Sequence, residues 1–522
     1  MNKQLFKDSI LKGYSCKGDF ITLGGAMIDG ICQKDTLVNI PLKTLNRHGL
    51  IAGATGTGKS KTLQVVSEQL SLKGVPVLLM DVKGDLSGLA KAGEEKSFIT
   101  ERHSKIGIPY HAEPMPVELL SISNDKGIKL RATVTEFGPV LFSKILELND
   151  VQSGIISLVF KYSDDNQLPL LDLKDLKKLL QFVINDGKET IKEEYGAVSS
   201  ASVNTIIRKI IELEQQGAEL FFGEPSFEVN DLLRTDNQGR GYISILRLTD
   251  IQDKPKLFSS FMLSLLAEIY ANFPEAGDME KPKLVLFIDE AHLVFKEASR
   301  VLLDQIEAII KLIRSKGVGV FFCTQNPTDI PNVVLSQLGL KIQHALRAFT
   351  AKDRKEIKQT AENYPISEFY KTDIVLTSLG IGEALITALN EKGIPTPLVA
   401  TYMQAPKSRM DILSPEEIND LLKRSNLFTK YEQTIDRTSA YEILKSKIEA
   451  SQDKEHQRKL NEDIKKSKKI KSEMEDPSMI ETLSKNTMVR QVGRTLVREL
   501  ARGLMGALGV STTSRKRYSK RR

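Results

Sequence analysis

The chain has 522 residues, of which 41% are hydrophobic, and its formal net charge is +7. This length suits roughly two to four domains with cores of their own. No apolar run approaches the roughly 18 residues that span a bilayer, and the start MNKQLFKDSI lacks the apolar segment of a secretory signal. These features argue against a membrane protein and predict a cytoplasmic location, while the small positive excess permits an acidic partner without requiring one.

The chain contains three cysteines, Cys16, Cys32 and Cys323. Their odd number and the lack of a CxxC spacing argue against a disulfide framework or a zinc site. We expect them to be reduced and to pack as small hydrophobic residues.

Short apolar runs bounded by turn residues recur, a pattern typical of parallel strands buried on both faces. They are GLIAG (49–53), VPVLLMD (75–81), GYISIL (241–246), KLVLFID (283–289), VGVFFCT (318–324), IQHALRAF (342–349), EALITAL (383–389) and TPLVATYM (396–403). Helix-period segments such as 60–74 and 298–317 stand between several of them. The alternation predicts an α/β fold with a mainly parallel sheet.

Changes of texture along the chain predict five segments. They are a first part of the core over 1–116, a mostly helical insertion over 117–230, a second part of the core over 231–410, a charged helical linker over 411–485, and an amphipathic basic helix with a basic tail over 486–522. The last helix has an apolar stripe formed by Val489, Val492, Leu496, Leu500, Leu504 and Leu508. A second stripe consists of Arg490, Arg494, Arg498 and Arg502. Its basic groups suit a nucleic-acid backbone or plain solvation, and its apolar side suits packing on a subunit.

The stretch GATGTGKS satisfies the phosphate-loop pattern, and it follows an apolar strand and opens a helix. The predicted nucleotide-binding residues are Gly53, Ala54, Thr55, Gly56, Thr57, Gly58, Lys59, Ser60 and the adjoining Lys61. The glycines let successive amides face phosphates at the helix N-terminus. Lys59 would bridge the β- and γ-phosphates of ATP, and Ser60 would hold Mg²⁺.

An acidic pair ends the run KLVLFIDEAH. Asp289 can hold the magnesium shell, and Glu290 can orient and deprotonate the attacking water. A solvated turn is the alternative, which the phosphate loop upstream disfavours. Asp81 ends another apolar strand and is either a second carboxylate near the metal or a turn residue.

The strand 318–324 should lie beside the strand that ends in Asp289. Gln325 would then sense water or the γ-phosphate, although a plain loop role is the alternative. Arg314, on the helix before this strand, either complements the helix C-terminus or projects into the nucleotide site of an adjacent subunit. His292 follows the acidic pair, where a structural role is the simpler interpretation.

Together, several motifs resemble the HerA-like branch of the HerA–FtsK superfamily of P-loop ATPases. They are NRHGLIAGATGTGKSKTLQ, LLMDVKGDL, LFIDEAHLVF, LIRSKGVGVFFCTQNPTDIPNVVLSQLGLKIQHALRAFT and VGRTLVRELARGLMGALG. The likeness covers about residues 20–405 and a tail segment near 490–510. It implies a RecA-like core assembled as a ring, usually a hexamer, that hydrolyses ATP with Mg²⁺ at subunit interfaces.

The resemblance also assigns roles to individual residues. It implies that Lys59 and Ser60 are Walker A residues and that Asp289 and Glu290 are the Walker B pair. It also implies a second-strand acid at Asp81, a polar sensor at Gln325 and an arginine finger at Arg314. Arg47 matches a basic position that approaches the nucleotide, and pairing with a surface acid is the alternative.

The better-known relatives pump double-stranded DNA, so the resemblance implies a DNA-translocating motor. Fewer than fifty residues precede the phosphate-loop strand, which leaves no room for the β-barrel that docks a partner nuclease in HerA proteins. That departure puts a nuclease partnership in doubt. The alternative function is an assembly or regulatory ATPase that acts on a protein complex without moving DNA.

Overall fold

The computed structural model describes residues 3–474, apart from 252, 253, 278, 298, 299, 434 and 436. The chain divides into two compact units, Met1–Leu444 and Lys445–Arg522. Of the second unit, the structure describes the part of helix α17 (Ala440–Met474) that follows Leu444, a polar helix. The predicted basic helix and tail over 486–522 lie outside the described residues.

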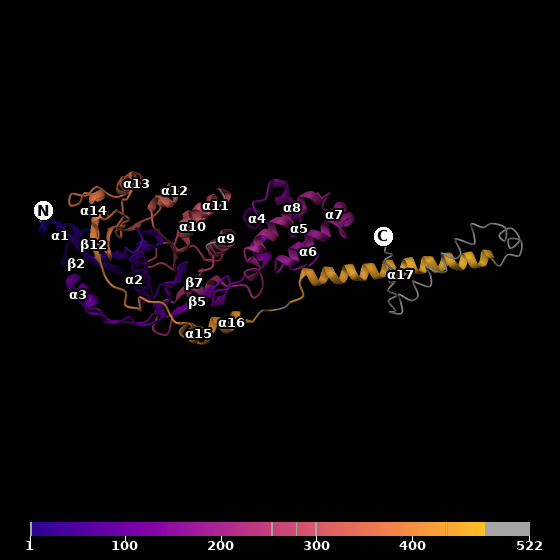
Figure 1. The fold of residues 1–522 in the computed structure, drawn as a ribbon, viewed down its shortest axis with the longest axis horizontal. Coiled ribbons are helices and arrows are strands. Elements are labelled where there is room, and N and C mark those ends of the chain that lie inside the picture. Colours follow the sequence, from indigo (N-terminus) through magenta and orange to yellow (C-terminus); the bar gives the residue numbers. More distant parts are fainter. Residues whose placement is uncertain are drawn as a thin grey trace, which may run out of the picture. The chain divides into compact units, whose positions relative to one another are not determined.

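A single large sheet organises the first unit (Figure 1). Its strands are, in spatial order, β2 (Ile31–Pro41), β1 (Phe20–Ile28), β12 (Val399–Met403), β11 (Glu383–Thr387), β10 (Leu340–His344), β3 (Gly49–Ala52), β9 (Val318–Thr324), β8 (Leu284–Ile288), β4 (Val77–Asp81), β7 (Ile243–Arg247), β5 (Val117–Ser121) and β6 (Ile128–Lys129). From β10 to β6 all neighbours pair in parallel, and the other pairs are antiparallel. The predicted α/β class and mainly parallel sheet are confirmed.

The central strands are buried on both faces. Every residue of β3, β9, β8 and β4 is buried, and successive residues of a strand point to opposite faces. Helix α2 (Lys59–Leu72) packs on β3 and β4, and α11 (Arg300–Ile313) packs on β9 and on α9 (Pro255–Asn272). Continuous apolar runs such as VGVFF are therefore what these positions require.

The residues before the phosphate-loop strand extend the sheet. Helix α1 (Lys3–Gly13) precedes a hairpin of β1 and β2, and β1 pairs with β12. Asp29 and Gly30 form the two-residue turn of this hairpin with φ of 50° and 72°, the left-handed conformation that such turns need. In this structure a helix and a hairpin therefore occupy the short segment ahead of β3.

A helical insertion leaves the sheet after β6 and returns at β7 (Figure 1). It contains α4 (Val134–Ile145), α5 (Asp150–Asp165), α6 (Leu173–Ile184), α7 (Lys188–Glu194), α8 (Ser200–Gln215), η3 (Ala218–Leu220) and η4 (Val229–Leu233). The side chains of Thr133, Asn149 and Asp172 cap α4, α5 and α6 through capping boxes. Within the predicted insertion, 117–230, the first residues instead form β5 and β6 of the sheet.

The remaining short elements connect the strands. They are α3 (Ser97–Ile106), α10 (His292–Glu297), α12 (Asn332–Leu335), α13 (Ala351–Glu362), α14 (Thr372–Ser378), η1 (Leu42–Arg47), η2 (Ser87–Ala90), η5 (Arg314–Lys316) and η6 (Pro327–Asp329).

The segment expected to be a charged linker, 411–485, begins with two packed helices. Helices α15 (Pro415–Lys423) and α16 (Asn426–Glu432) contact β5 and β6, respectively, and bury Leu422 and Tyr431. Each is only about two turns long, so few apolar residues are enough to pack it, and the polar composition conceals this. They cover the end of the sheet farthest from β2.

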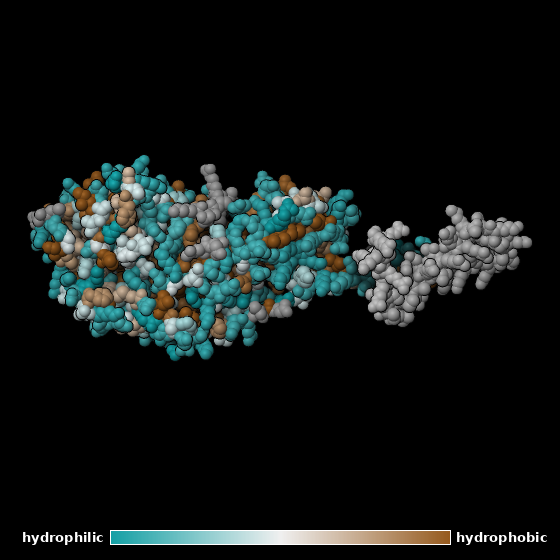
Figure 2. All heavy atoms as spheres, in the orientation of Figure 1, coloured by the Kyte–Doolittle hydropathy of each residue, from teal (hydrophilic) through white to brown (hydrophobic). Residues whose placement is uncertain are grey.

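None of the helices in the described ranges is both long and apolar enough to cross a membrane. On the face of the first unit that Figure 2 shows, hydrophilic residues predominate and hydrophobic residues form smaller areas between them.

His48 ties the beginning of β3 to β9 and α11. The Val320 amide donates to Nδ1 at 3.0 Å, so Nε2 carries the proton and donates to the carbonyl oxygen of Ile310 at 2.9 Å. Burial lowers the pKa of His48 to about 4; the Ile310 carbonyl opposes this shift, and the charge of Arg314 adds to it. A neutral imidazole thus holds β9, and the helix that leads to Arg314, against the phosphate-loop strand.

We expect the free energy of unfolding to fall as the pH drops from about 6.5 toward 4, because the unfolded chain protonates His48 there and the folded chain does not. The His48 contribution between pH 7 and pH 5 is about 2 kcal/mol. His48→Gln keeps a donor for Ile310 but cannot titrate. In urea unfolding, the free energy of unfolding of wild type should therefore fall by about 2 kcal/mol more between pH 7 and pH 5 than that of the variant. Equal pH dependence of the two proteins would contradict this role.

Candidate active site

The predicted site residues follow strands that end at one edge of the sheet. The phosphate loop follows β3, Gln325 follows β9 and Asp289 follows β8. Strand β9 lies between the other two, and Ala52 of β3 is level with Thr324 of β9. Because the three strands are parallel, their carboxyl ends meet where ligands bind to folds of this kind.

The phosphate loop, residues 53–60, connects β3 directly to α2. Gly58 caps the helix with φ of 114°, and Gly53 has φ of 150° and packs so closely that a Cβ there would lie 2.5 Å from the Cβ of His344. The Thr57 hydroxyl donates to the Ala54 carbonyl oxygen at 2.7 Å. The loop is thus a preformed turn at a helix N-terminus, the arrangement that binds phosphate.

Lys59 lies folded inside this loop. Its Nζ donates to the carbonyl oxygens of Gly53 at 2.7 Å and Ala54 at 3.1 Å. Burial lowers its pKa, as does the charge of Lys83, while the acidic pair opposes both. A bound phosphate would offer this ammonium group a charged acceptor in place of two carbonyls.

The next two residues differ in where their side chains point. Ser60, half-buried, lies at the beginning of α2 beside Lys59. The Lys61 side chain donates to the Met410 carbonyl oxygen at 2.5 Å, and burial lowers its pKa. The group of Lys61 that suits a phosphate at the helix N-terminus is therefore its main-chain amide.

Asp289 and Glu290 are both buried at the end of β8, with 7% and 6% exposure. Burial raises the pKa of Asp289 to about 6. The charge of Lys83 opposes this shift, and the charge of Glu290 adds to it. The Glu290 carboxylate forms an ion pair with Lys83 and lies 3.1 Å from Nδ1 of His292. Glu290 has φ of 47°, a left-handed backbone uncommon outside glycine, which is typical of functional sites.

The donors at this edge fit Mg²⁺. A carboxylate and a hydroxyl, from Asp289 and Ser60, are the hard oxygen ligands that this ion prefers. In the part of the chain that the structure describes, no group of three or more His, Cys, Asp or Glu side chains forms a complete metal cage.

Asp81 is occupied by its own loop. Its carboxylate accepts hydrogen bonds from the amides of Gly84 at 2.7 Å, Asp85 at 3.3 Å and Leu86 at 3.1 Å. Burial raises its pKa to about 7, Asp85 adds to the shift, and the amide hydrogen bonds oppose it. These contacts favour the turn role over that of a free carboxylate near the metal.

Gln325 is exposed at the end of β9, and the Thr55 hydroxyl lies 3.5 Å from its side-chain oxygen. Beside them is a cavity of about 470 Å³. It is lined by Ala54, Thr55, Gln325, Asn326, Leu346, Arg347, Phe349, Asp353, Glu356 and Ile357. The predicted sensor thus adjoins the phosphate loop and faces open space.

The two predicted arginines precede β3 and β9, so they lie at the amino ends of these strands, opposite the phosphate loop. Arg314 is exposed in η5, before β9, and the seven residues of β9 separate it from Gln325 by roughly 23 Å. Arg47 precedes β3 with its guanidinium near Gly393. Neither side chain is placed to reach the phosphate loop of its own chain.

Sequence reasoning did not single out Lys83, which the structure brings to both carboxylates of the acidic pair. The signal was present in VKGD, directly after the strand that ends in Asp81. His292, assigned a structural role, contacts Glu290. Both residues became visible only through the pairing of β4 with β8 and the turn after β8.

The helicase HerA-like C-terminal family model matches residues 29–515. The chain belongs to this family. The match spans both parts of the sheet, the helical insertion and the phosphate loop, so the membership predicted from the motifs is confirmed.

Two relatives indicate the range of the family. The chain is 24% identical over 377 residues to the DNA double-strand break repair helicase HerA of Sulfurisphaera tokodaii, covering 70% of this chain and 66% of that protein, just under two thirds. It is 25% identical over 365 residues to the DNA import protein CedB of Sulfolobus acidocaldarius, covering 68% and 52%, respectively.

Among solved structures, the plasmid coupling protein TrwB in complex with ADP and Mg²⁺ is similar. The TM-score is 0.51 at 14% identity, and the match covers 78% of this chain and 94% of that one. The likeness confirms the fold, an α/β core built on a mainly parallel sheet.

We expect Asp81→Asn to lower the free energy of unfolding by about 1–3 kcal/mol, because an amide offers one acceptor oxygen where three backbone amides converge. Urea unfolding measures this, with ATP binding followed alongside. Asp236→Asn is a matched control, since Asp236 also accepts two backbone amides in a turn outside the site. Unchanged stability combined with lost ATP binding would instead identify Asp81 as a nucleotide-site carboxylate.

Proposed function

We propose that this chain is a Mg²⁺-dependent ATP hydrolase that assembles into a ring, most simply a hexamer, and moves double-stranded DNA. The observation that supports it best is the common edge at which Lys59, Glu290 and Gln325 stand. A phosphate-binding lysine, a candidate general base and a polar sensor there are the parts that ATP hydrolysis needs.

In the proposed mechanism, the amides of residues 53–60 and the N-terminus of α2 bind the phosphates of ATP. Lys59 exchanges the Gly53 and Ala54 carbonyl oxygens for phosphate oxygens. Ser60 and Asp289 would hold Mg²⁺, which when bound neutralises charge on the transferred phosphoryl group.

Hydrolysis needs one proton transfer. The oxygen of a water molecule attacks the γ-phosphorus while the bond to the bridging oxygen of ADP breaks, and Glu290 accepts the proton that the water loses. Gln325 orients the water or contacts the γ-phosphate. The products are ADP and inorganic phosphate.

The position of Arg314 supports the proposed ring. A guanidinium is the usual donor that neutralises charge on a transferred phosphoryl group. Arg314 is exposed about the length of β9 away from its own phosphate loop, which is consistent with a role at the site of a neighbouring copy. A ring gives every site such a neighbour.

Double-stranded DNA is the proposed cargo because HerA and CedB, the named relatives, act on DNA. The arginine stripe and basic tail beyond residue 485 supply cations suited to a phosphate backbone. An assembly ATPase that does not move DNA is the competing outcome.

We expect wild-type protein to hydrolyse ATP and Glu290→Gln to lower kcat by about 10²-fold or more, because the variant lacks a proton acceptor. Glu362→Gln, at an exposed position of α13, is the control and should match wild type. A steady-state phosphate-release assay with particle mass measured alongside tests both the chemistry and the ring.

The same assay with linear duplex DNA tests the motor. We expect DNA to raise the turnover several-fold and to bind with an affinity that falls as salt is added, because phosphate contacts release counterions. Turnover unchanged by DNA, with no salt-dependent binding, would contradict the motor and favour the assembly ATPase.

A further inference from the structure

Lys83 holds the group that should act as the base. It forms an ion pair with Glu290, and the charge of Asp289 also acts on it. The Glu290 side chain is buried, whereas the Lys83 side chain is 36% exposed. A ligand entering the site can therefore reach the lysine, while burial keeps the glutamate in place.

This ion pair works against the proposed hydrolysis. A carboxylate beside an ammonium group is a weaker acceptor for the proton of water, because the positive charge stabilises its ionised form. Glu290 is therefore a better base once it is released from Lys83, and an incoming anion that attracts the ammonium group favours this release.

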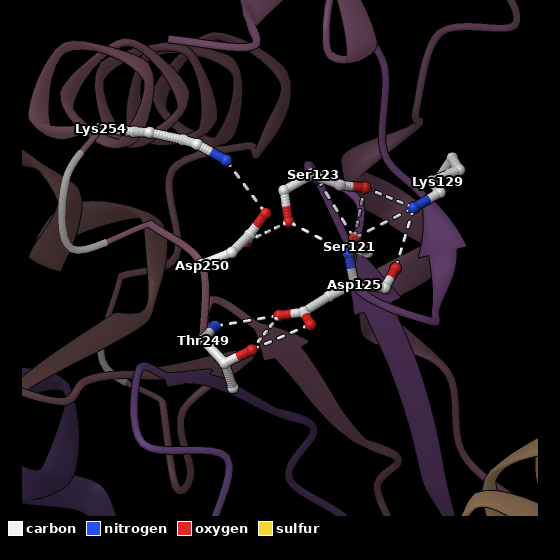
Figure 3. A network of polar contacts seen from close by, with 7 residues as sticks. All are labelled: Ser121, Ser123, Asp125, Lys129, Thr249, Asp250 and Lys254. Atoms are coloured by element: carbon white, nitrogen blue, oxygen red, sulfur yellow. Dashed lines mark hydrogen bonds and ion pairs between the residues drawn. The ribbon is translucent and has the colours of Figure 1, made fainter.

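The backbone of Lys83 is fixed. Gly84, with φ of 75°, donates to Asp81 and packs so that a Cβ there would lie 2.8 Å from Cγ2 of Thr249. The amide and hydroxyl of Thr249 donate to the Asp125 carboxylate at 2.9 and 2.7 Å (Figure 3).

The residues behind Thr249 are held in turn. Asp250 accepts from the Ser123 hydroxyl at 2.6 Å and from Nζ of Lys254 at 3.0 Å (Figure 3). Lys129 donates to the Asp125 carbonyl oxygen at 2.9 Å. This network holds Thr249, the residue against which Gly84 of the loop after β4 packs.

The same edge offers the lysine one competing partner. The charge of Lys83 acts on Lys59, and the charges of Asp289 and Glu290 act on both lysines. In the proposed reaction the γ-phosphate enters this space, where it is bound by Lys59. It brings the anionic oxygens that can draw Lys83 away from Glu290.

We propose that Lys83 is a positioning residue that restrains Glu290 without nucleotide and transfers to the γ-phosphate when ATP binds. This inference rests on the proposed function. It makes release of the base depend on the γ-phosphate, so that ADP, which lacks this group, leaves Glu290 restrained.

The test compares the affinities of wild type and Lys83→Met for ATPγS and for ADP, each with Mg²⁺. We expect Lys83→Met to bind ATPγS about tenfold more weakly and ADP within about twofold of wild type, since only ATPγS carries the γ-group. In hydrolysis, KM for ATP should rise, and Lys83→Arg should restore much of the ATPγS affinity because it keeps the charge.

Lys177→Met is the matched control. Lys177 forms a 2.7 Å ion pair with Glu214 in the helical insertion and is 25% exposed, so its loss tests the effect of breaking a comparable pair away from the site. It should change neither affinity.

Equal weakening of ATPγS and ADP binding, or no weakening of either, would overturn the proposal for Lys83. If Lys83→Met does not fold, as judged by its unfolding transition, the same comparison is made with Lys83→Gln and Lys83→Arg. The proposed function fails separately, if Lys59→Ala binds and hydrolyses ATP as wild type does.

Discussion

Parallel hydrogen bonding between β3, β9 and β8 fixes the edge at which the phosphate loop, Gln325 and the acidic pair stand. Each of these groups is the residue or turn that follows a strand, so the register of the strands decides their spacing. The strands are buried on both faces, so a shift in register would disrupt the packing of their side chains against the helices on each side. The stability of the sheet and the geometry of the site therefore have one cause. His48 reinforces it by joining the start of β3 to β9 and α11.

The second constraint is charge. Lys59, Lys83, Asp289 and Glu290 lie together at a largely buried edge, two cations beside two carboxylates. Buried charges are costly unless they are paired, and Lys83 pairs with Glu290 without a ligand. An incoming phosphate with its cation can exchange partners within this cluster. This exchange is how nucleotide binding can release the proposed base from Lys83.

Much of the fold and site could be predicted because the evidence is contiguous. The phosphate loop occupies eight adjacent residues, and each acid or sensor ends an apolar run. The edge that holds Arg314 followed from strand direction alone. The Lys83 contact could not be predicted, because it depends on β4 lying beside β8, about 200 residues away in the chain. The choice between the two roles of Asp81 also needed the three amides of its loop. Helices α15 and α16 bury too few apolar residues to stand out in a charged segment.

The central claim is that β9 links two sites, with Gln325 at one and Arg314 reaching the next. Mixing Arg314→Ala subunits with Lys59→Ala subunits tests it most directly. Each variant alone should be nearly inactive in ATP hydrolysis, and a random equal mixture should regain up to roughly a quarter of wild-type turnover per subunit, because an intact Lys59 then meets an intact Arg314 at that fraction of interfaces. A mixture no more active than the sum of the separate variants would contradict the account.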